Sequence, residues 1–372
     1  MASVGEFSVY NHTNWPYVDS PWDLLEPCRE VELGLPESSQ TKCVISSILG
    51  NWSAYVLPSV CSVGFVGSVA IAVALFAHPG RLTRQVLFIS FMLLGNAGTN
   101  ISFAWFWMFP AKGLPFVTNG TVYYFMPYDS FAACLLFRSV YSFTSTMSVN
   151  FLLLASVDRF MIIYFPLKYA TMSKRYGWYV SGCTILLSIV LIIPVTAQIS
   201  LHHVGDKLIC WFNSDNTFME IYHIMISNCA VVQPLLTGLF NLAFFIRIRR
   251  TILKRSSKNW TKSERAQVRA SLLLLILSAI YLLFSAPQTI AYIAAFILSR
   301  KNSGVDSAAR LAYNIADIGW NLYFLRELAN ILALFWFNSI IRQLFLSLLP
   351  WIPKSWIDTD VETTVITEKP QH

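Results

Sequence analysis

Residues 129–169 read DSFAACLLFRSVYSFTSTMSVNFLLLASVDRFMIIYFPLKY. Between residues 135 and 157 this stretch carries one charged side chain, Arg138. At a rise of ~1.5 Å per helical residue, the apolar interior is long enough to cross the ~30 Å hydrocarbon core of a bilayer. We therefore predict a membrane-spanning helix that ends on the charged pair Asp158-Arg159.

The composition of the whole chain supports a membrane protein. Of its 372 residues, 55% are hydrophobic and only 13% are charged, which is too few charges for the surface of a water-soluble protein. Apolar stretches of helical length recur along the chain. The predicted spans are residues 52–77, 85–109, 129–164, 178–200, 219–246, 270–299 and 311–337. Their short connections leave little room for a catalytic domain, so we do not expect an enzyme.

The positions of Lys and Arg predict the orientation, because these residues concentrate in cytoplasmic loops. The first, third and fifth connections are basic, whereas the first 52 residues carry seven acidic side chains against two basic ones. We therefore expect a multi-pass plasma-membrane protein with its N-terminus outside the cell and its C-terminus in the cytoplasm. The net charge of +7 then reflects contact with anionic lipid of the inner leaflet, and no nucleic-acid partner is expected.

The end of the stretch at residues 129–169 resembles the third transmembrane helix of rhodopsin-like G-protein-coupled receptors. In that family an Asp/Glu-Arg-Tyr motif precedes a proline-leucine pair, and a cysteine lies at the opposite end of the helix, as Cys134 does here. The resemblance implies an all-α bundle of seven transmembrane helices that couples to a heterotrimeric G protein. Asp158 is expected to neutralise Arg159 while the bundle is closed. The residues that match the coupling motif are Asp158, Arg159, Phe160, Pro166 and Leu167.

Four parts are expected along the chain. Residues 1–51 are rich in proline and acidic residues, which predicts an irregular extracellular tail. Residues 52–337 would form the seven-helix bundle. Residues 338–349 carry apolar side chains at three- and four-residue spacing, which predicts a short amphipathic eighth helix on the inner leaflet. Residues 350–372 would be a cytoplasmic tail.

Cysteines and glycosylation motifs fall in the parts that are predicted to be extracellular. Disulfides persist outside the cell, and the family joins the outer end of its third helix to the second outer loop. The resemblance therefore implies the pair Cys134–Cys210, and Cys28–Cys43 is then the remaining pair. The expected N-glycosylation sites are Asn11 and Asn119, each within an Asn-x-Ser/Thr motif.

Several positions that act as switches in the family carry other residues here. Many relatives bind sodium through an aspartate on the second span, where this chain has Asn96 and no acid. The seventh span instead carries Arg326 beside Glu327, and buried charges are costly unless they find partners. We expect the guanidinium to fill the place of the ion; the alternative is that it only braces the helices. The residues assigned to this centre are Asn96, Ser148, Arg326, Glu327 and Asn330.

Polar side chains in the outer half of the bundle are the candidates for ligand contact, although each could instead be an interhelical or interfacial group. Arg138 is expected to face the cavity, where it could bind a carboxylate or a phosphate. The place of the aspartate that binds amines in amine receptors is taken by Tyr141, and the seventh span has no lysine for retinal. The candidates are Arg138, Tyr141, Glu220, His223, Gln288, Tyr292, Asp317 and Asn321.

These features predict a ligand-activated receptor that signals through a heterotrimeric G protein, with a peptide or another polar ligand. A chemosensory receptor for small molecules is the alternative within the same fold. A membrane transporter is the alternative of another class, but it would need mid-depth charges on several spans, and only Arg326 and Glu327 fit that description. No cofactor or metal is expected, because the histidines and cysteines lack metal-ligand spacing.

Overall fold

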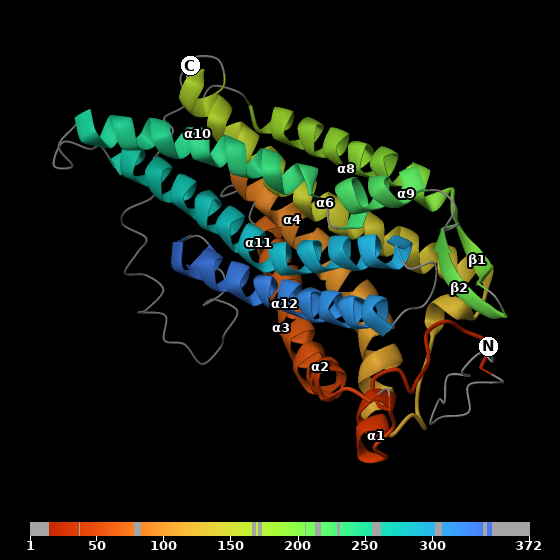
Figure 1. Cartoon of the computed structure of the whole chain (residues 1–372). Coiled ribbons are helices and arrows are strands. Elements are labelled where there is room, and N and C mark those ends of the chain that lie inside the picture. Colours follow the sequence, from red (N-terminus) through yellow and green to blue (C-terminus); the bar gives the residue numbers. More distant parts are fainter. Residues whose placement is uncertain are drawn as a thin grey trace.

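The computed structural model describes residues 15–36, 38–77, 83–165, 169, 173–204, 206–212, 217–228, 231–254, 262–301, 307–337 and 341–343. Within these residues, seven long helical segments form a bundle, and a two-stranded hairpin covers one end of it (Figure 1). The predicted all-α bundle is therefore confirmed. Of the expected eighth helix at residues 338–349, only residues 341–343 are described, and the tail at residues 350–372 lies outside the described residues.

The helical segments follow the order of the chain. Segment one joins α2 (Gln40–Asn51), the π-helical η1 (Trp52–Val56) and α3 (Leu57–Ala77). Segment two joins α4 (Arg84–Thr99), the π-helical η3 (Asn100–Gly113) and α5 (Leu114–Val117). Segments three and four are α6 (Phe131–Tyr164) and α8 (Lys174–Thr196). Segment five comprises α9 (Thr217–Tyr222), η5 (His223–Asn228) and α10 (Val232–Lys254). Segments six and seven are α11 (Lys262–Lys301) and α12 (Ser307–Phe337).

Most of these segments have the length and apolar character that crossing a membrane requires. Five described helices meet both conditions: Gln40–Ala77, Arg84–Val117, Phe131–Tyr164, Arg175–Thr196 and Leu272–Leu298. Segment five contributes the shorter apolar helix Val232–Arg247. Segment seven carries four charged residues over its length, which lowers its mean hydropathy. Those residues are Arg310, Asp317, Arg326 and Glu327.

Small residues let the helices approach closely, as is common in membrane proteins. A Cβ atom on Gly95 would lie 2.8 Å from the backbone nitrogen of Ser148, so α4 and α6 touch through their backbones. A Cβ atom on Gly319 would lie 2.6 Å from the Cα of Gln288, which brings α12 equally close to α11. These two contacts set the spacing around α6 and α12, the helices that carry the charged motifs.

Segment five is interrupted, whereas the sequence predicted one span over residues 219–246. Helix η5 ends at Asn228, Val231 is not helical, and α10 begins at Val232. Pro234 lies in the first turn of α10, where proline is tolerated because the first N–H groups of a helix have no intrahelical partner.

The predicted irregular tail is corrected at residues 26–32 and 40–51, which are helical. Residues 15–20, which we call the strap, lie along strand β2 (Lys207–Phe212), which pairs antiparallel with β1 (Ile199–Val204). The amide of Leu208 donates to the Pro16 carbonyl at 2.7 Å, and the amide of Val18 donates to the Leu208 carbonyl at 3.0 Å. Helix α1 (Glu26–Glu32) follows, and segment one begins at Gln40, before the predicted start of the first span. Backbone pairing thus orders a stretch whose composition suggested no structure.

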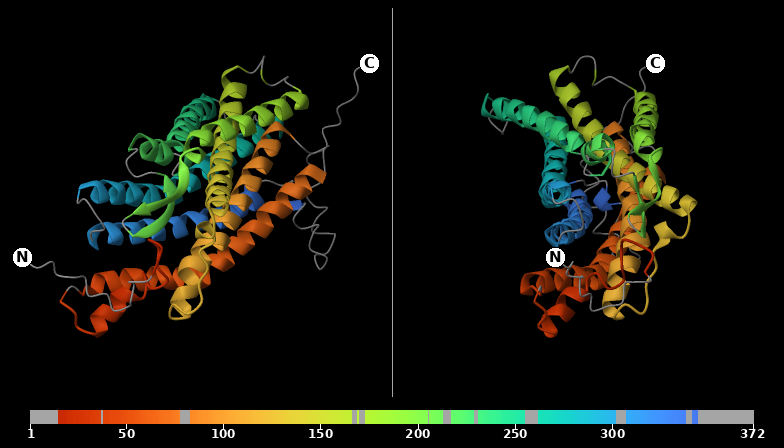
Figure 2. Two further views of the ribbon diagram at one scale, coloured as in Figure 1. Left: turned by 90° about the vertical axis from the view of Figure 1, so that its right-hand side faces the viewer. Right: turned by 45° about the vertical axis from the view of Figure 1, so that its right-hand side comes forward.

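The strap and α1 lie toward the end of the bundle that the hairpin covers. In both views of Figure 2, α6 finishes at the top, whereas α1 lies at the bottom and the hairpin lies between them. We call the covered end the hairpin end, and the end at which α6 finishes the Arg159 end.

Candidate ligand and coupling sites

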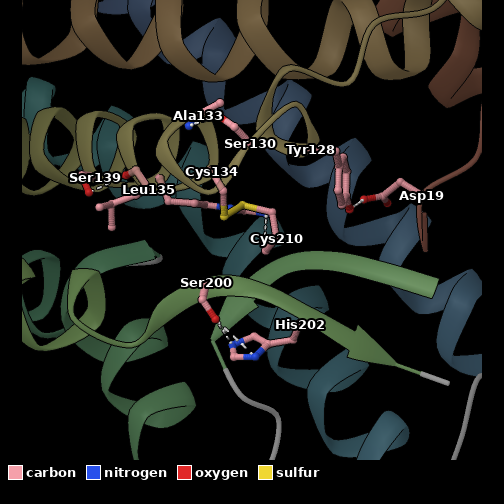
Figure 3. The surroundings of a disulfide bond; sticks show 11 residues. Asp19, Tyr128, Ser130, Ala133, Cys134, Leu135, Ser139, Ser200, His202 and Cys210 are labelled. Atoms are coloured by element: carbon pink, nitrogen blue, oxygen red, sulfur yellow. Dashed lines mark hydrogen bonds between the residues drawn. A yellow bond between two sulfur atoms is a disulfide. The ribbon is translucent and has the colours of Figure 1, made fainter. Parts of the chain in front are cut away.

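A disulfide fixes the hairpin on α6. The side chain of Ser130 accepts a hydrogen bond from the amide of Ala133 at 3.1 Å and caps the helix, so Cys134 lies in its first turns. Cys134 is bonded to Cys210 at the centre of β2 (Figure 3). A second disulfide joins Cys28 of α1 to Cys43 of α2. Both predicted pairs are therefore present.

Arg138 lies one helical turn beyond Cys134 and is covered by β2 rather than open to a cavity. Its Nη2 donates to the Cys210 carbonyl at 3.3 Å, and its guanidinium lies 4.2 Å from the centre of the Trp211 ring. The disulfide causes this cover, because it brings the β2 backbone over the same face of α6. The Nε atom of Arg138 has no hydrogen-bond partner among the described residues. An acidic group that displaced part of β2 would find a charged donor there.

Trp211 joins a second predicted residue to this group. The ring of His223 lies edge-on to Trp211 at 5.3 Å and is buried beneath the hairpin. Tyr141 is also fully buried, against Phe103 at 4.9 Å and Trp320 at 5.7 Å. At the hairpin end of α6, the Arg138 guanidinium therefore lies near a group of buried aromatic rings that includes Tyr141.

The other predicted ligand residues are divided between two places. The rings of Tyr292 and Tyr313 meet at 6.2 Å between α11 and α12, and the Tyr292 side chain lies near the Arg138 guanidinium. Gln288 is buried in α11 at the contact with α12, whereas Glu220 is half-buried on α9. The structure thus gathers Arg138, Tyr141, His223 and Tyr292 near one another, and Glu220 lies on α9, which directly precedes the helix that begins with His223.

Asp317 and Asn321 belong to a separate polar contact. The Asp317 carboxylate forms an ion pair with Lys112 of η3, and the Asn321 side chain donates to the Asp317 carbonyl at 2.9 Å. Sequence analysis missed Lys112. A lysine and an aspartate, each near the hairpin end of an apolar span, were the available signal, because buried charges seek partners. The pair links segment two to segment seven.

The strap completes the hairpin end. The hydroxyl of Tyr128 donates to the Asp19 carboxylate (Figure 3), and the Tyr17 ring stacks on Tyr128 at 4.7 Å. Burial, reinforced by the Asp19 charge, raises the pKa of the Tyr128 phenol above its ordinary value, so the phenol stays neutral and donates. A cavity of about 10 Å³, enough for about one water molecule, lies between the strap and η3. Its walls include Asp19, Asp23, Trp107, Lys112 and Phe125.

Asn119, a predicted glycosylation site, is exposed in the connection between segments two and three. It has a φ angle of 52° and precedes Gly120 at 75°, so the motif lies in a tight left-handed turn. A Cβ atom on Gly120 would lie 2.4 Å from the Trp22 indole nitrogen, so the turn packs directly on the segment after the strap. Glycosylation of Asn119 stays a prediction, and Asn11 lies outside the described residues.

Among the described residues, Arg326 is the largest fully buried side chain, and its partners come from several helices. Its Nη2 donates to the Glu327 carboxylate at 2.6 Å and to the Asn96 side-chain carbonyl at 3.2 Å. Ser148 donates to the same Asn96 oxygen, so Ser148 reaches the guanidinium only through Asn96. Arg326 and Glu327 are each 1% exposed, so each charge depends on the other.

Two tyrosines that the sequence analysis did not assign hold the same guanidinium by cation–π contacts. Its carbon lies 3.9 Å from the Tyr323 ring centre and 4.5 Å from that of Tyr281. Tyr323 precedes Arg326 by three residues in α12, a spacing that could have revealed it. Tyr281 comes from α11, and no local pattern points to it. Asn330 is buried, and its side-chain oxygen has no hydrogen-bond partner among the described residues.

At the Arg159 end, the ion pair of Asp158 differs from the one expected. The Asp158 carboxylate lies 3.5 Å from Nη2 of Arg84 in α4, and no ion pair joins it to Arg159 in the described part of the chain. Arg84 is the first residue of α4, and the packing of α4 against α6 brings its guanidinium to the Asp158 carboxylate. Phe160 stacks on Tyr164 at 4.3 Å. Pro166 and Leu167 lie outside the described residues.

A comparison with protein-family models supports the resemblance seen in the sequence. The model of the 7 transmembrane receptor (rhodopsin family) matches residues 100–317, which is more than half of the chain. None of the curated proteins compared with the chain matches it. The matched residues include all of α6 with its Asp158-Arg159 motif and both cysteines of the hairpin disulfide. The chain belongs to the rhodopsin family of seven-transmembrane receptors.

Proposed function

We propose that the chain is a plasma-membrane receptor that binds an extracellular ligand at the hairpin end and activates a heterotrimeric G protein at the Arg159 end. One observation carries the proposal: α6 bears the covered guanidinium of Arg138 near one end and Arg159 near the other. A single helix of 34 residues therefore connects the two sites. A ligand that shifts the start of α6 would also shift Arg159.

The proposed orientation puts the Arg159 end in the cytoplasm. Helices α8 and α11 begin with lysine, and α10 ends with lysine, at the end where α6 finishes. Basic residues concentrate on the cytoplasmic side of membrane proteins. On this orientation the Asn119 motif and both disulfides are extracellular, residues 338–349 lie on the inner leaflet, and residues 350–372 form the cytoplasmic tail.

The proposed ligand is a peptide or another polar molecule with an acidic group. Arg138 supports this choice, because its Nε lacks a hydrogen-bond partner in the described residues and a guanidinium binds carboxylates in bidentate geometry. Burial of Tyr141 among aromatic rings favours the second candidate, a chemosensory receptor whose small-molecule ligand would contact those rings. The two candidates differ in whether Arg138 or Tyr141 dominates binding.

We further propose that Arg326 takes the place of a bound sodium ion in this receptor. The contacts of Arg326 with Asn96 and Glu327 support a fixed internal cation. A second cation would then meet repulsion at the same place. The alternative, a purely bracing role, predicts the same loss of stability on substitution but says nothing about sodium.

The test of the receptor function is G-protein activation in cells that express the chain. Wild type should raise G-protein dissociation, either without ligand or with acidic peptides. Arg159→Ala should abolish that signal at equal surface expression, and Arg138→Gln should weaken only the response to acidic peptides. The matched control is Arg175→Gln, which removes an exposed charge at the same end. A signal that Arg159→Ala leaves undiminished would contradict the proposal, and ligand-driven solute uptake would favour a transporter.

A further inference from the structure

A guanidinium from another helix reaches the coupling motif. Arg84 is the first residue of α4, and its Nη2 lies 3.5 Å from the Asp158 carboxylate. The same nitrogen donates to the backbone carbonyl of Tyr169 at 2.9 Å. Both charged side chains are 10% exposed, so water screens their attraction only in part. One side chain therefore links segment two, segment three and the chain beyond α6.

The position of Arg84 is unfavourable for a cation unless an anion offsets it. The N-terminus of a helix carries a partial positive charge, which repels a basic residue in the first turn. Thr83 already caps this helix by accepting a hydrogen bond from the Val86 amide at 3.4 Å. The Asp158 carboxylate therefore offsets the repulsion between the Arg84 charge and the N-terminus of α4.

The aliphatic part of the Arg84 side chain is packed in place, as its guanidinium is. Helix α8 passes over it, since a Cβ atom on Gly177 would lie 3.1 Å from the Arg84 Cγ. Because Gly177 has no side chain, α8 can pack closely against the aliphatic part of Arg84. The guanidinium thus has little freedom to leave Asp158 by rotating its own side chain.

Asp158 lies within reach of two cations, and only Arg84 is paired with it. Its carboxylate lies 3.5 Å from the Nη2 of Arg84, and no ion pair joins it to Arg159 in the described part of the chain. Meanwhile the Nε atom of Arg159 is buried and has no hydrogen-bond partner among the described residues. The neighbouring Phe160 ring meets Phe240 of α10 at 5.3 Å. This contact opposes a rotation of α6 that would change which arginine pairs with Asp158.

We infer that Arg84 is a positioning residue for coupling. It occupies the Asp158 carboxylate, which leaves Arg159 available to an acceptor group on the G protein, and it holds the backbone at Tyr169 beside that site. The inference rests on the proposed function and adds to it the residue that keeps Arg159 available for the G protein. Without the charge of Arg84, Asp158 has Arg159 as its remaining cation, and Arg159 becomes occupied.

The test uses purified full-length receptor in lipid nanodiscs with purified heterotrimeric G protein, and it measures ligand-free nucleotide exchange. Arg84→Gln keeps a donor for the Tyr169 carbonyl but removes the charge, and it should lower exchange about fivefold, as expected for a partly buried ion pair. Arg84→Lys should restore at least half of the rate. In an Asp158→Asn background, Arg84→Gln should change exchange by less than about twofold, because the competition has been removed. Arg175→Gln is the control for a general charge effect.

A structural role alone would lower the melting temperature and the exchange rate together in both backgrounds, and that result would overturn the inference. A faster rate in Arg84→Gln would also overturn it, because Arg84 would then be a brake. If Arg84→Gln does not fold, Asp158→Asn decides: exchange at or above the wild-type rate supports the inference, and a loss contradicts it. No exchange in the wild type would overturn the proposed function itself, whereas an active wild type with an equally active Arg84→Gln overturns only the role of Arg84.

Discussion

The two ends of α6 are held by interactions of very different strength. At the hairpin end, Cys134 is covalently bonded to β2, and β2 is also paired with the strap. The contacts at the Arg159 end are noncovalent and include one ion pair, the hydrogen bond from Arg84 to the Tyr169 carbonyl, and aromatic contacts. A disulfide contributes ~2–4 kcal/mol, whereas a partly exposed ion pair contributes ~0–1 kcal/mol. The contacts at the Arg159 end therefore cost less free energy to change than the covalent attachment at the hairpin end.

Removing the disulfide should erase most of this difference. Cys134→Ala with Cys210→Ala opens a link between residues 76 apart in sequence and should lower the free energy of unfolding by about 4.5 kcal/mol. Surface expression should fall accordingly. Cys183→Ala is the control, because that thiol is free and exposed. Thermal unfolding in detergent measures the change, and peptide mapping that finds free thiols at both positions in the wild type would contradict the prediction.

The centre between the two ends should be nearly as sensitive. Arg326→Ala leaves the Glu327 carboxylate buried without its cation and should cost about 3–4 kcal/mol. Arg326→Gln with Glu327→Gln removes both charges and should cost clearly less. Agonist affinity should be the same in sodium chloride and in the chloride of a bulky cation at equal concentration. A loss of affinity that is specific to sodium would refute the replacement of the ion by Arg326.

The strap should respond more weakly. Tyr128→Phe deletes the hydrogen bond to Asp19 and should cost about 1 kcal/mol, with faster hydrogen exchange at the Val18 amide. Because the pKa of Tyr128 is raised in the folded state, the bond contributes fully below the ordinary pKa of tyrosine, about 10, and is lost as the pH rises above that value. Tyr124→Phe is the matched control, since its hydroxyl donates to Asp129 and makes no strap contact. Equal exchange rates in the two variants would show that the strap does not depend on Tyr128.

The smallest effect concerns the assignment of the ends to the two sides of the membrane. Asn119→Gln should lower stability only slightly, because the side chain is exposed but its backbone is left-handed, and it should remove one glycan from the protein made in cells. Asn259→Gln alters another Asn-x-Thr motif, which the proposed topology puts in the cytoplasm, and it should not change the mass. Loss of a glycan from Asn259→Gln would reverse the orientation.

The features that the sequence predicted correctly depend on local patterns. The apolar run before Asp158 identified α6, and the adjacent charges of Arg326 and Glu327 indicated a buried pair that needed partners. Asn96 could be named as one partner because the family pattern on the second span marks its position. In each of these cases the decisive residues lie within one helix or one motif.

The features that the sequence did not reveal are contacts between distant segments. Arg84 was interpreted only as a topology signal, since nothing near it in sequence indicates that α4 begins beside Asp158. Pro16 and Val18 pair through backbone groups with Leu208, and backbone pairing leaves no trace in side-chain composition. Tyr281 reaches Arg326 from α11, a helix that packs against α12. Packing, rather than pattern, decides such contacts.

The length of α6 makes bilayer thickness a variable of this receptor. Its 34 residues extend about 51 Å, against a hydrocarbon core of ~30 Å. The excess must be accommodated by tilt or by turns that stand in the headgroup layers. Because Cys134 and Arg159 are fixed near opposite ends of one rigid rod, thinning the membrane would tilt the rod and carry both toward the lipid headgroups together. A change in bilayer thickness should therefore act on both ends of α6 at the same time.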